Sequence, residues 1–229
     1  MKLSKRLQVL ADLIEKYKQG DVLADIGTDH AYLPCYLIEN KVVDKAYACD
    51  VARGPFESSL STIKQHHLEN DIEALLGDGI NPILDKKVDM IAIAGMGSYL
   101  ITEILEKNLN YLKNVQVLFL QPNANTDHLR KYLFEHNFII LDEYLVKDGY
   151  HIYDMMAVKN GIEKRDYDEY DIEFGPILRK KKTSLFIEKW CKQKNVFQNI
   201  IRDLNQSHPR YKELKHKIEM IEVILNESL

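Results

Sequence analysis

The chain is short of cysteine, of metal-binding motifs and of long apolar runs. Its 229 residues include three cysteines without a C-x-x-C pair, which argues against a disulfide framework or a structural zinc site and fits a reducing compartment. The eight histidines form no H-E-x-x-H motif, so we expect no metal. Charges interrupt the apolar positions of the N-terminal amphipathic segment, so we expect neither a signal peptide nor a membrane span, and a cytoplasmic protein.

The glycine-rich motif that brings a dinucleotide pyrophosphate against the backbone is also missing. Residues Val22–Ile26 read as a buried strand that ends at Gly27, and the following turn is G-T-D-H-A instead of G-x-G-x-x-G. Gly27 lets a ligand approach the backbone, because no Cβ stands in the way. Asp25 and Asp29 would repel a phosphate but attract a cofactor that is cationic and rich in hydroxyls. S-adenosylmethionine has a sulfonium, an ammonium and a ribose diol, so the pattern favours a methyltransferase over a dehydrogenase.

Short apolar strands alternate with helical patterns up to residue 136. The expected strands are 22–26, 45–50, 72–76, 88–94 and 115–120, and the expected helices are 32–40, 55–69, 98–108 and 125–136. This alternation predicts an α/β fold with a parallel sheet and helices on both faces. Two further runs, Phe138–Val146 and His151–Lys159, read as an antiparallel hairpin at the sheet edge. A parallel sheet closed by such a hairpin is typical of class I, Rossmann-like, methyltransferases.

The composition changes near residue 160. The acidic, tyrosine-rich stretch 163–176 reads as a linker, and two long helical patterns follow, with apolar stripes from Leu178 to Leu204 and from Tyr211 to Leu225. We therefore expect two domains, 1–160 and 161–229, the second a C-terminal α-helical hairpin with coiled-coil character. The sequence leaves the oligomeric state open, with a monomer slightly favoured.

Charge is spread unevenly along the chain. Residues 1–159 hold 17 basic and 23 acidic side chains, whereas residues 175–217 hold 12 basic and 3 acidic ones. A basic segment on an acidic protein is what an anionic polymer selects, although a solvated helical face gives the same pattern. Both interpretations stay open for the candidate phosphate contacts Lys180, Lys181 and Lys182.

Glycines and polar side chains gather where the expected parallel strands end, which is where ligands bind in such sheets. Asp50 ends the second strand and is placed to accept hydrogen bonds from both ribose hydroxyls. Asp78 is placed to bind an adenine amino group beside the backbone of Gly79. Any one of these aspartates is as well explained as a helix cap or turn former. The expected cofactor-binding residues are Asp25, Gly27, Asp29, His30, Asp50, Asp78, Gly79, Gly95, Met96 and Gly97.

Six segments, in order along the chain, resemble the TrmK family of bacterial tRNA (adenine-N1)-methyltransferases. They are DIGTDHAYLP, GPFESS, GDGI, IAGMG, LQPN with a following LR, and DGYHIYD. The resemblance implies methyl transfer from S-adenosylmethionine to adenine 22 of tRNA, and a coiled-coil C-terminal domain. Ser98 departs from the pattern, because a further glycine is expected after IAGMG. The alternatives are a methyltransferase for another RNA position or a small molecule, and a non-catalytic RNA-binding relative.

Asp29 is the candidate catalytic residue. Adenine N1 has a free lone pair and needs no prior deprotonation, but positive charge develops on the purine ring, so a carboxylate nearby is attractive in the transition state. The alternative role of Asp29 is the N-cap of the next helix. For His30 the alternative is a hydrogen-bonded structural histidine. The candidate substrate contacts in this domain are Arg6, Tyr32, Tyr99, Gln121 and Asn123.

These candidate substrate contacts also have ordinary structural interpretations. Arg6 would reach a cofactor carboxylate or an RNA phosphate, or lie on a helix surface. Tyr32 and Tyr99 would stack on an extruded base or pack in the core. Asn123 would hold the edge of the adenine or form a turn after Pro122.

Overall fold

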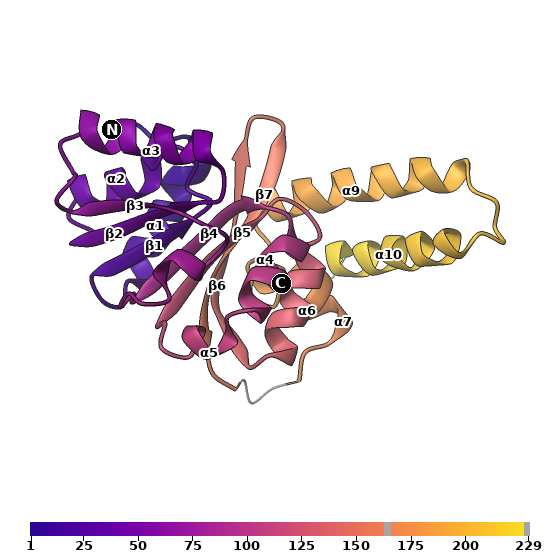
Figure 1. Cartoon of the computed structure of the whole chain (residues 1–229). Coiled ribbons are helices and arrows are strands. Elements are labelled where there is room, and N and C mark those ends of the chain that lie inside the picture. Colours follow the sequence, from indigo (N-terminus) through magenta and orange to yellow (C-terminus); the bar gives the residue numbers. More distant parts are fainter. Residues whose placement is uncertain (163–165, 227–229) are drawn as a thin grey trace. The chain divides into compact units, whose positions relative to one another are not determined.

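The computed structural model describes residues 1–162 and 166–226, which form two compact units, Met1–Asp166 and Tyr167–Leu229 (Figure 1). Within these residues, the first unit holds a seven-stranded sheet in the order β3-β2-β1-β4-β5-β7-β6. Its strands are β1 (Val22–Ile26), β2 (Lys45–Asp50), β3 (Ile72–Leu76), β4 (Met90–Met96), β5 (Val117–Pro122), β6 (Phe138–Asp148) and β7 (His151–Asn160). Strands β1 to β5 run parallel, and β7 is antiparallel to both β5 and β6. The predicted Rossmann-like sheet with a terminal hairpin is confirmed.

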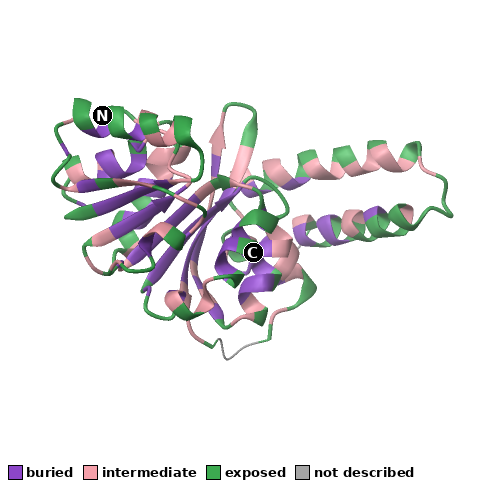
Figure 2. Cartoon of the chain, in the orientation of Figure 1, coloured by how far each residue is buried: buried purple, intermediate pink, exposed green. Residues whose placement is uncertain are grey.

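Helices cover both faces of this sheet (Figure 1). They are α1 (Lys5–Tyr17), α2 (Tyr32–Glu39), α3 (Arg53–Gln65), α4 (Ser98–Glu106), α5 (Leu109–Leu112) and α6 (Thr126–Glu135), with a 3-10 turn at Asn81–Ile83. Leu10 and Ile14 of α1 pack with Leu33 of α2 against Phe119 and Met155 of the sheet. The central strands are accordingly buried along most of their length, whereas the outer sides of the helices are exposed (Figure 2).

Strand β1 lies between β2 and β4, and the direction of chain progression reverses there. From β1 the chain continues through α2 to β2, whereas from β4 it continues through α4 to β5 in the opposite direction along the sheet. The two helices therefore diverge, which leaves an open crevice at the carboxyl ends of β1 and β4. This crevice is the expected binding position in a sheet of this topology.

The second unit is helical and differs in two details from the expectation. Its helices are α7 (Glu169–Phe174), α8 (Leu178–Lys181), α9 (Ser184–Arg202) and α10 (Pro209–Asn226). The expected linker 163–176 contains α7, while residues 163–165 lie outside the described part of the chain. The first long helical pattern is interrupted at Lys182, which has a φ of 41°, and Thr183 caps α9 by accepting the N–H of Phe186. Helices α9 and α10 form the expected hairpin, shown in orange and yellow in Figure 1.

The three cysteines are free, and they differ in exposure. Cys35 on α2 and Cys49 on β2 are buried, and burial raises the pKa of each thiol to about 12. Cys191 on α9 is exposed.

Candidate functional site

The turn between β1 and α2 encloses a small cavity of about 90 Å³ at the carboxyl end of β1. Six of the predicted site residues line it: Arg6, Asp25, Gly27, Asp29, His30 and Tyr32. Tyr32 stacks on His30 with 5.1 Å between the ring centres, and Tyr32 is 43% exposed. The structure therefore brings together residues from α1, from β1 and from the turn that follows it.

The backbone of this turn is left-handed at Gly27, Asp29 and Ala31, with φ values of 77°, 57° and 54°. The φ of Gly27 is what requires a glycine, because L side chains rarely adopt it, whereas a Cβ built there would lie 2.2 Å from Cε of Met96, the movable end of a flexible side chain. Ala31 occupies the N-cap position of α2. The alternative role of Asp29 as the cap of that helix is therefore wrong.

The main chain of Asp29 is held from two sides while its carboxylate stays open to solvent. Its N–H lies 3.4 Å from Oδ2 of Asp50, and its carbonyl accepts the hydroxyl of buried Ser59 at 3.1 Å. The Asp29 side chain is 71% exposed, and its Oδ2 lies 3.7 Å from Nε2 of His30. This geometry presents a carboxylate on a fixed backbone. Ser59 lies in the GPFESS segment, but no local pattern indicates its contact 30 residues away.

Asp50 ends β2 and fixes the same turn through backbone hydrogen bonds. Its Oδ1 accepts the N–H of Ala52 at 2.8 Å, and its Oδ2 faces the N–H of Asp29. A carboxylate has about four acceptor positions. Two positions remain, which is the number that a vicinal diol requires.

Asp25 is the buried anion of the site, with 5% of its surface exposed. Burial raises the pKa of its carboxyl group to about 6, and the charge of Asp50 adds to the rise. The neighbouring Thr28 and the charge of the Arg6 guanidinium oppose this rise of the pKa. At neutral pH the group is therefore a poorly solvated carboxylate, which a further cation would stabilise.

The part-buried side chain of Arg6 extends from α1 to the carboxyl end of β5, so its predicted alternative as a helix-surface arginine is wrong. Its guanidinium donates to Oε1 of Gln121 and lies 5.6 Å from the ring centre of Tyr153. Its backbone N–H donates to Oδ2 of Asp148 at 3.2 Å. The tip of the β6–β7 hairpin thus fixes the start of α1, a contact that the sequence pattern does not show.

The ends of β4 and β5 are joined by the amide side chains of Gln121 and Asn123. The register of β4 shifts at Gly95, whose φ is 78°, and the N–H of Gly95 donates to Oε1 of Gln121 at 3.1 Å. Asn123 donates to the carbonyl of Gly95 at 2.7 Å and accepts a hydrogen bond from Gln121 at 3.1 Å. Asn123 is nonetheless exposed, and its amide has one N–H and one lone pair left for a ligand.

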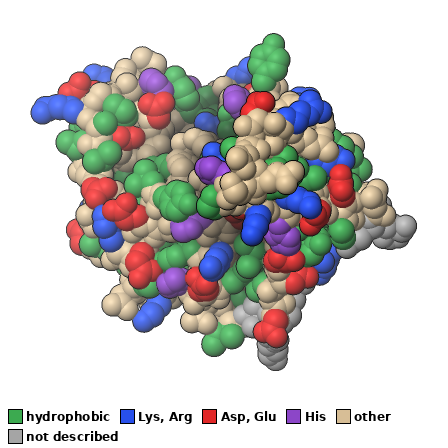
Figure 3. All heavy atoms as spheres, turned by 90° about the vertical axis from the view of Figure 1, so that its right-hand side faces the viewer, with side chains coloured by type: hydrophobic (Ala, Val, Ile, Leu, Met, Phe, Trp, Pro, Cys, Tyr) green, Lys and Arg blue, Asp and Glu red, His purple; other side chains and the backbone are tan. Residues whose placement is uncertain are grey.

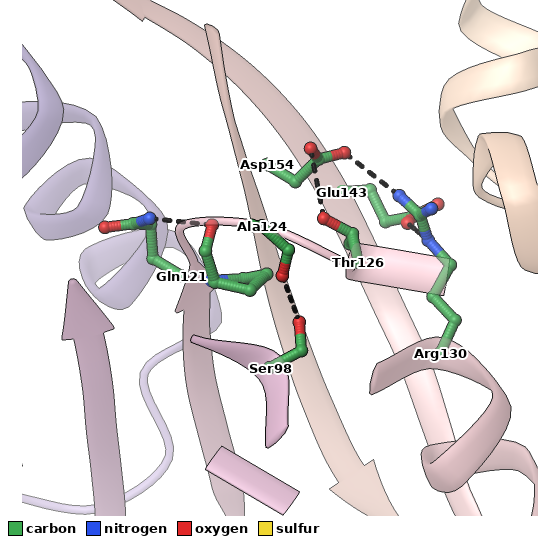
Figure 4. A network of polar contacts seen from close by, with 8 residues as sticks. Ser98, Gln121, Ala124, Thr126, Arg130, Glu143 and Asp154 are labelled. Atoms are coloured by element: carbon green, nitrogen blue, oxygen red, sulfur yellow. Dashed lines mark hydrogen bonds and ion pairs between the residues drawn. The ribbon is translucent and has the colours of Figure 1, made fainter. Parts of the chain in front are cut away.

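Ser98, which stands where the family pattern has a glycine, makes a buried hydrogen bond in this structure. Ser98 is fully buried, and its hydroxyl donates to the carbonyl of Ala124 at 2.6 Å (Figure 4). Gly97 is the N-cap residue of α4. Tyr99 is 63% exposed and contacts the ring of His128 with 4.2 Å between centres. A role for Tyr99 in core packing is therefore wrong, and His128 is a neighbour that the sequence analysis missed.

Asp78 and Gly79 line a second cavity of about 60 Å³ together with Leu100, Glu103 and Lys107. A larger cavity of about 840 Å³ lies near Tyr111, His136 and Asn160, at the amino ends of the parallel strands. It contains none of the predicted site residues, so it is no part of this site.

Within the described residues, no cluster of three or more His, Cys, Asp or Glu side chains could hold a metal ion. No described helix has the length and apolarity that a membrane crossing requires.

The predicted phosphate contacts belong to the second unit. Lys180 and Lys181 are exposed on α8, and Lys182 is half-buried at its end. Acidic residues of the expected linker pair with basic ones, as in Arg179 with Asp168 at 2.6 Å and Lys217 with Glu173 at 3.0 Å.

These pairings reduce the basic excess that the sequence indicates. Residues 167–229 together hold 12 basic and 10 acidic side chains. On the face of the molecule seen in Figure 3, basic and acidic side chains are likewise interspersed. The segment 175–217 is therefore strongly basic only when its acidic neighbours are left out.

A parallel sheet that reverses its order at β1, closes with an antiparallel hairpin and carries acids at the ends of β1 and β2 defines a class I methyltransferase. The chain belongs to the TrmK family, tRNA (adenine(22)-N(1))-methyltransferase, whose pattern matches residues 23–223.

Relatives in three bacteria resemble this chain over nearly its whole length. The tRNA (adenine(22)-N(1))-methyltransferase of Bacillus subtilis (strain 168) is 33% identical over 99% of this chain and 98% of that protein. A Streptococcus pneumoniae protein crystallised with S-adenosyl-L-methionine superposes with a TM-score of 0.89 at 34% identity, over 98% of this chain and 100% of that one. The M. capricolum TrmK, solved with S-adenosyl-homocysteine, superposes with a TM-score of 0.87 at 30% identity, over 98% of each chain.

Replacing Asp25 by asparagine should stabilise the protein at neutral pH. Because burial raises the pKa from 3.8 to about 6, folding favours the protonated acid, and the penalty is absent below about pH 4 and complete above pH 6. Asn imitates the neutral acid, so Asp25→Asn should raise the free energy of unfolding by about 1–3 kcal/mol at pH 7, with the gain shrinking toward pH 4.5. Urea unfolding of both proteins at the two pH values measures this.

Exposed Asp12 on α1 offers the matched control, Asp12→Asn. If Asp25→Asn gains no more at pH 7 than at pH 4.5, the attraction of Arg6 outweighs the burial of the carboxylate.

Proposed function

We propose that this chain transfers a methyl group from S-adenosyl-L-methionine to N1 of adenine 22 in tRNA, acting as a monomer in the cytoplasm. The observation that carries the proposal is the pair of carboxylates at the switch point. Asp25 is buried beside the cavity and Asp50 has two free acceptor positions. The full-length likeness to the Bacillus subtilis tRNA (adenine(22)-N(1))-methyltransferase supports the choice of substrate.

The residues at the strand ends fit this cofactor in charge and in space. Asp50 would accept the ribose hydroxyls, and Asp25 lies where a cationic group would be stabilised. Asp78 and the backbone of Gly79 would bind the adenine ring at the second cavity. Gly27 lines the first cavity with a left-handed backbone, and when bound, the cofactor supplies an electrophilic methyl group. His30, Gly95, Met96 and Gly97 complete the proposed cofactor-binding set.

Asp29 is the proposed catalytic residue because its carboxylate is exposed beside the cavity on a fixed backbone. Adenine N1 reacts through its own lone pair, so no protein base is needed for the attack. As positive charge develops on the purine, the Asp29 carboxylate stabilises it and accepts a hydrogen bond from the N6 amino group. His30, 3.7 Å away, restricts the position of that carboxylate.

The other substrate contacts are proposed from their exposure near the strand ends. Asn123 would hold the adenine edge with its remaining N–H and lone pair, and Gln121 supports Asn123. Tyr32 and Tyr99 are exposed aromatic rings that would stack on an extruded base. The Arg6 guanidinium donates a hydrogen bond to Gln121. We therefore propose that Arg6 orients this amide and adds positive charge for a cofactor carboxylate or an RNA phosphate.

The two domains have separate roles in this proposal. Residues 1–160 hold the cofactor and the target adenine, and residues 161–229 bind the tRNA backbone through Lys180, Lys181 and Lys182. The exposure of Lys180 and Lys181 supports this division.

The purified chain should methylate an unmodified tRNA transcript that carries adenine at position 22. Because m1A blocks Watson–Crick pairing, reverse transcription should stop at that position only when S-adenosyl-L-methionine is present. A transcript with guanine 22 serves as the control. A stop at another adenine would contradict the assigned position, and cofactor binding without any methylation would favour a non-catalytic relative.

Asp29→Ala and Asp50→Ala should fail in different ways. Loss of one electrostatic stabiliser should lower the single-turnover rate of Asp29→Ala about ten- to a thousandfold, with a much smaller change in cofactor affinity. Loss of a charged hydrogen-bond partner should weaken cofactor binding to Asp50→Ala by about 1.5–3 kcal/mol in calorimetry. If Asp29→Ala keeps its rate and loses only affinity, Asp29 is a cofactor ligand.

Lys180→Ala should weaken tRNA binding and reduce the log–log salt slope by roughly 0.7–0.9, because one phosphate contact and its counterion release are lost. Lys192 on α9 is the matched control, since it already pairs with Glu188 at 2.7 Å. Lys192→Ala should change the slope less, and neither variant should alter cofactor affinity. Filter binding between 50 and 300 mM salt measures both. An unchanged slope for Lys180→Ala would mean that Lys180 contacts no phosphate and belongs only to a solvated helical face.

A further inference from the structure

The loop from Pro122 to Thr126, between β5 and α6, carries the exposed Asn123 at the strand ends. Asn125 within it is left-handed, with a φ of 54°, and occupies the N-cap position of α6 without a side-chain capping bond. An exposed loop of this conformation stays in one position only if neighbouring groups hold it. Asn123 itself is bonded to Gly95 and Gln121, and two further side-chain anchors hold the rest of the loop, at Ala124 and at Thr126 (Figure 4).

The first anchor is the Ser98 hydroxyl on the carbonyl of Ala124. The second is a hydrogen bond from Oγ1 of Thr126 to Oδ2 of Asp154, 3.3 Å long. The other oxygen of Asp154 accepts from Nη2 of Arg130 at 3.1 Å. Both oxygens of Asp154 are therefore engaged, one with the loop and one with the arginine.

Arg130 is held in turn by the sheet. Its Nε donates to Oε1 of Glu143 at 2.8 Å, and the Arg130 and Glu143 side chains are 1% and 0% exposed. Asp154 is 5% exposed, so one cation and two anions are buried together. Buried ionic groups of this kind are seldom more stabilising than well-packed apolar side chains. Their directed geometry, which connects β6, β7 and the loop, is the property that an apolar cluster would lack.

We propose that Arg130 and Asp154 form a positioning network that acts through Thr126, and together with Ser98 fixes the loop so that Asn123 meets the target adenine. None of these four residues contacts the substrate in this proposal. The inference rests on the proposed function for the role of Asn123, whereas the anchoring of the loop is independent of it. The network then contributes to the methylation rate by limiting the orientations that the adenine adopts.

Thr126→Val tests the network, because it removes the hydroxyl and keeps the shape of the side chain. The turnover number for tRNA methylation should fall about tenfold, with KM for the cofactor nearly unchanged. Thr126→Ser keeps the hydroxyl and should restore the turnover number to within about twofold of the original. The matched control is Thr62→Val in α3, whose hydroxyl bonds within its own helix at 3.0 Å.

Hydrogen–deuterium exchange supplies a readout without tRNA. Amides of residues 123–126 should exchange faster in Thr126→Val than in Thr126→Ser or in the unaltered chain. A turnover number within twofold of the original for Thr126→Val, a loss that serine does not restore, or an equal loss in Thr62→Val would each overturn the proposal. If the unaltered chain does not methylate tRNA, the proposed function fails, and the exchange rates still decide whether the network anchors the loop.

Discussion

The whole site depends on the reversal of strand order at β1 and β4. Because α2 and α4 leave these neighbouring strands in opposite directions, a small cavity remains at their carboxyl ends, which Arg6 of α1 also lines. Asp25 lies at this cavity. Its main chain belongs to β1, an inner strand of the sheet, and its carboxylate is therefore poorly accessible to water. A buried carboxylate is unfavourable for folding, but a cation binds best where the anion is least hydrated. In the proposed function, stability and binding therefore make opposite demands on Asp25, a common conflict at functional sites.

Much of the fold is predictable from local patterns in the sequence. The predicted bounds of β1, β2 and β3 agree with the structure, because β1 and β2 are short buried apolar runs and each of the three strands ends at a glycine or an acid. Strands β4 and β5 extend to Met96 and Pro122, beyond their apolar runs. A bulge at Gly95 and amide contacts from the neighbouring strand continue the pairing there, and neither is a local property. The break at Lys182 was missed for a similar reason, since the apolar stripe continues on both sides of it.

Which candidate residues lie together was predictable only where one segment of the chain carries them. The turn that carries Asp25, Gly27 and Asp29 is such a segment, and its residues line one cavity. Contacts between distant segments were not predictable. Nothing in the sequence near Arg6 indicates that its guanidinium donates a hydrogen bond to Gln121, 115 residues further along the chain. The charge pattern was misleading in the same way. A count over a chosen window ignores the acids outside it that fold back onto the lysines.

The different burial of the three cysteines makes the chain suitable for labelling with one reporter. Cys35 and Cys49 combine a closed environment with raised pKa values, so thiolate-directed reagents find little reactive sulfur there. Cys191 is open to such reagents, on the helix that follows the proposed phosphate contacts. A maleimide dye or a nitroxide added to the native chain therefore attaches at one defined point. Fluorescence or electron paramagnetic resonance can then follow the second unit during RNA binding without any cysteine having to be replaced.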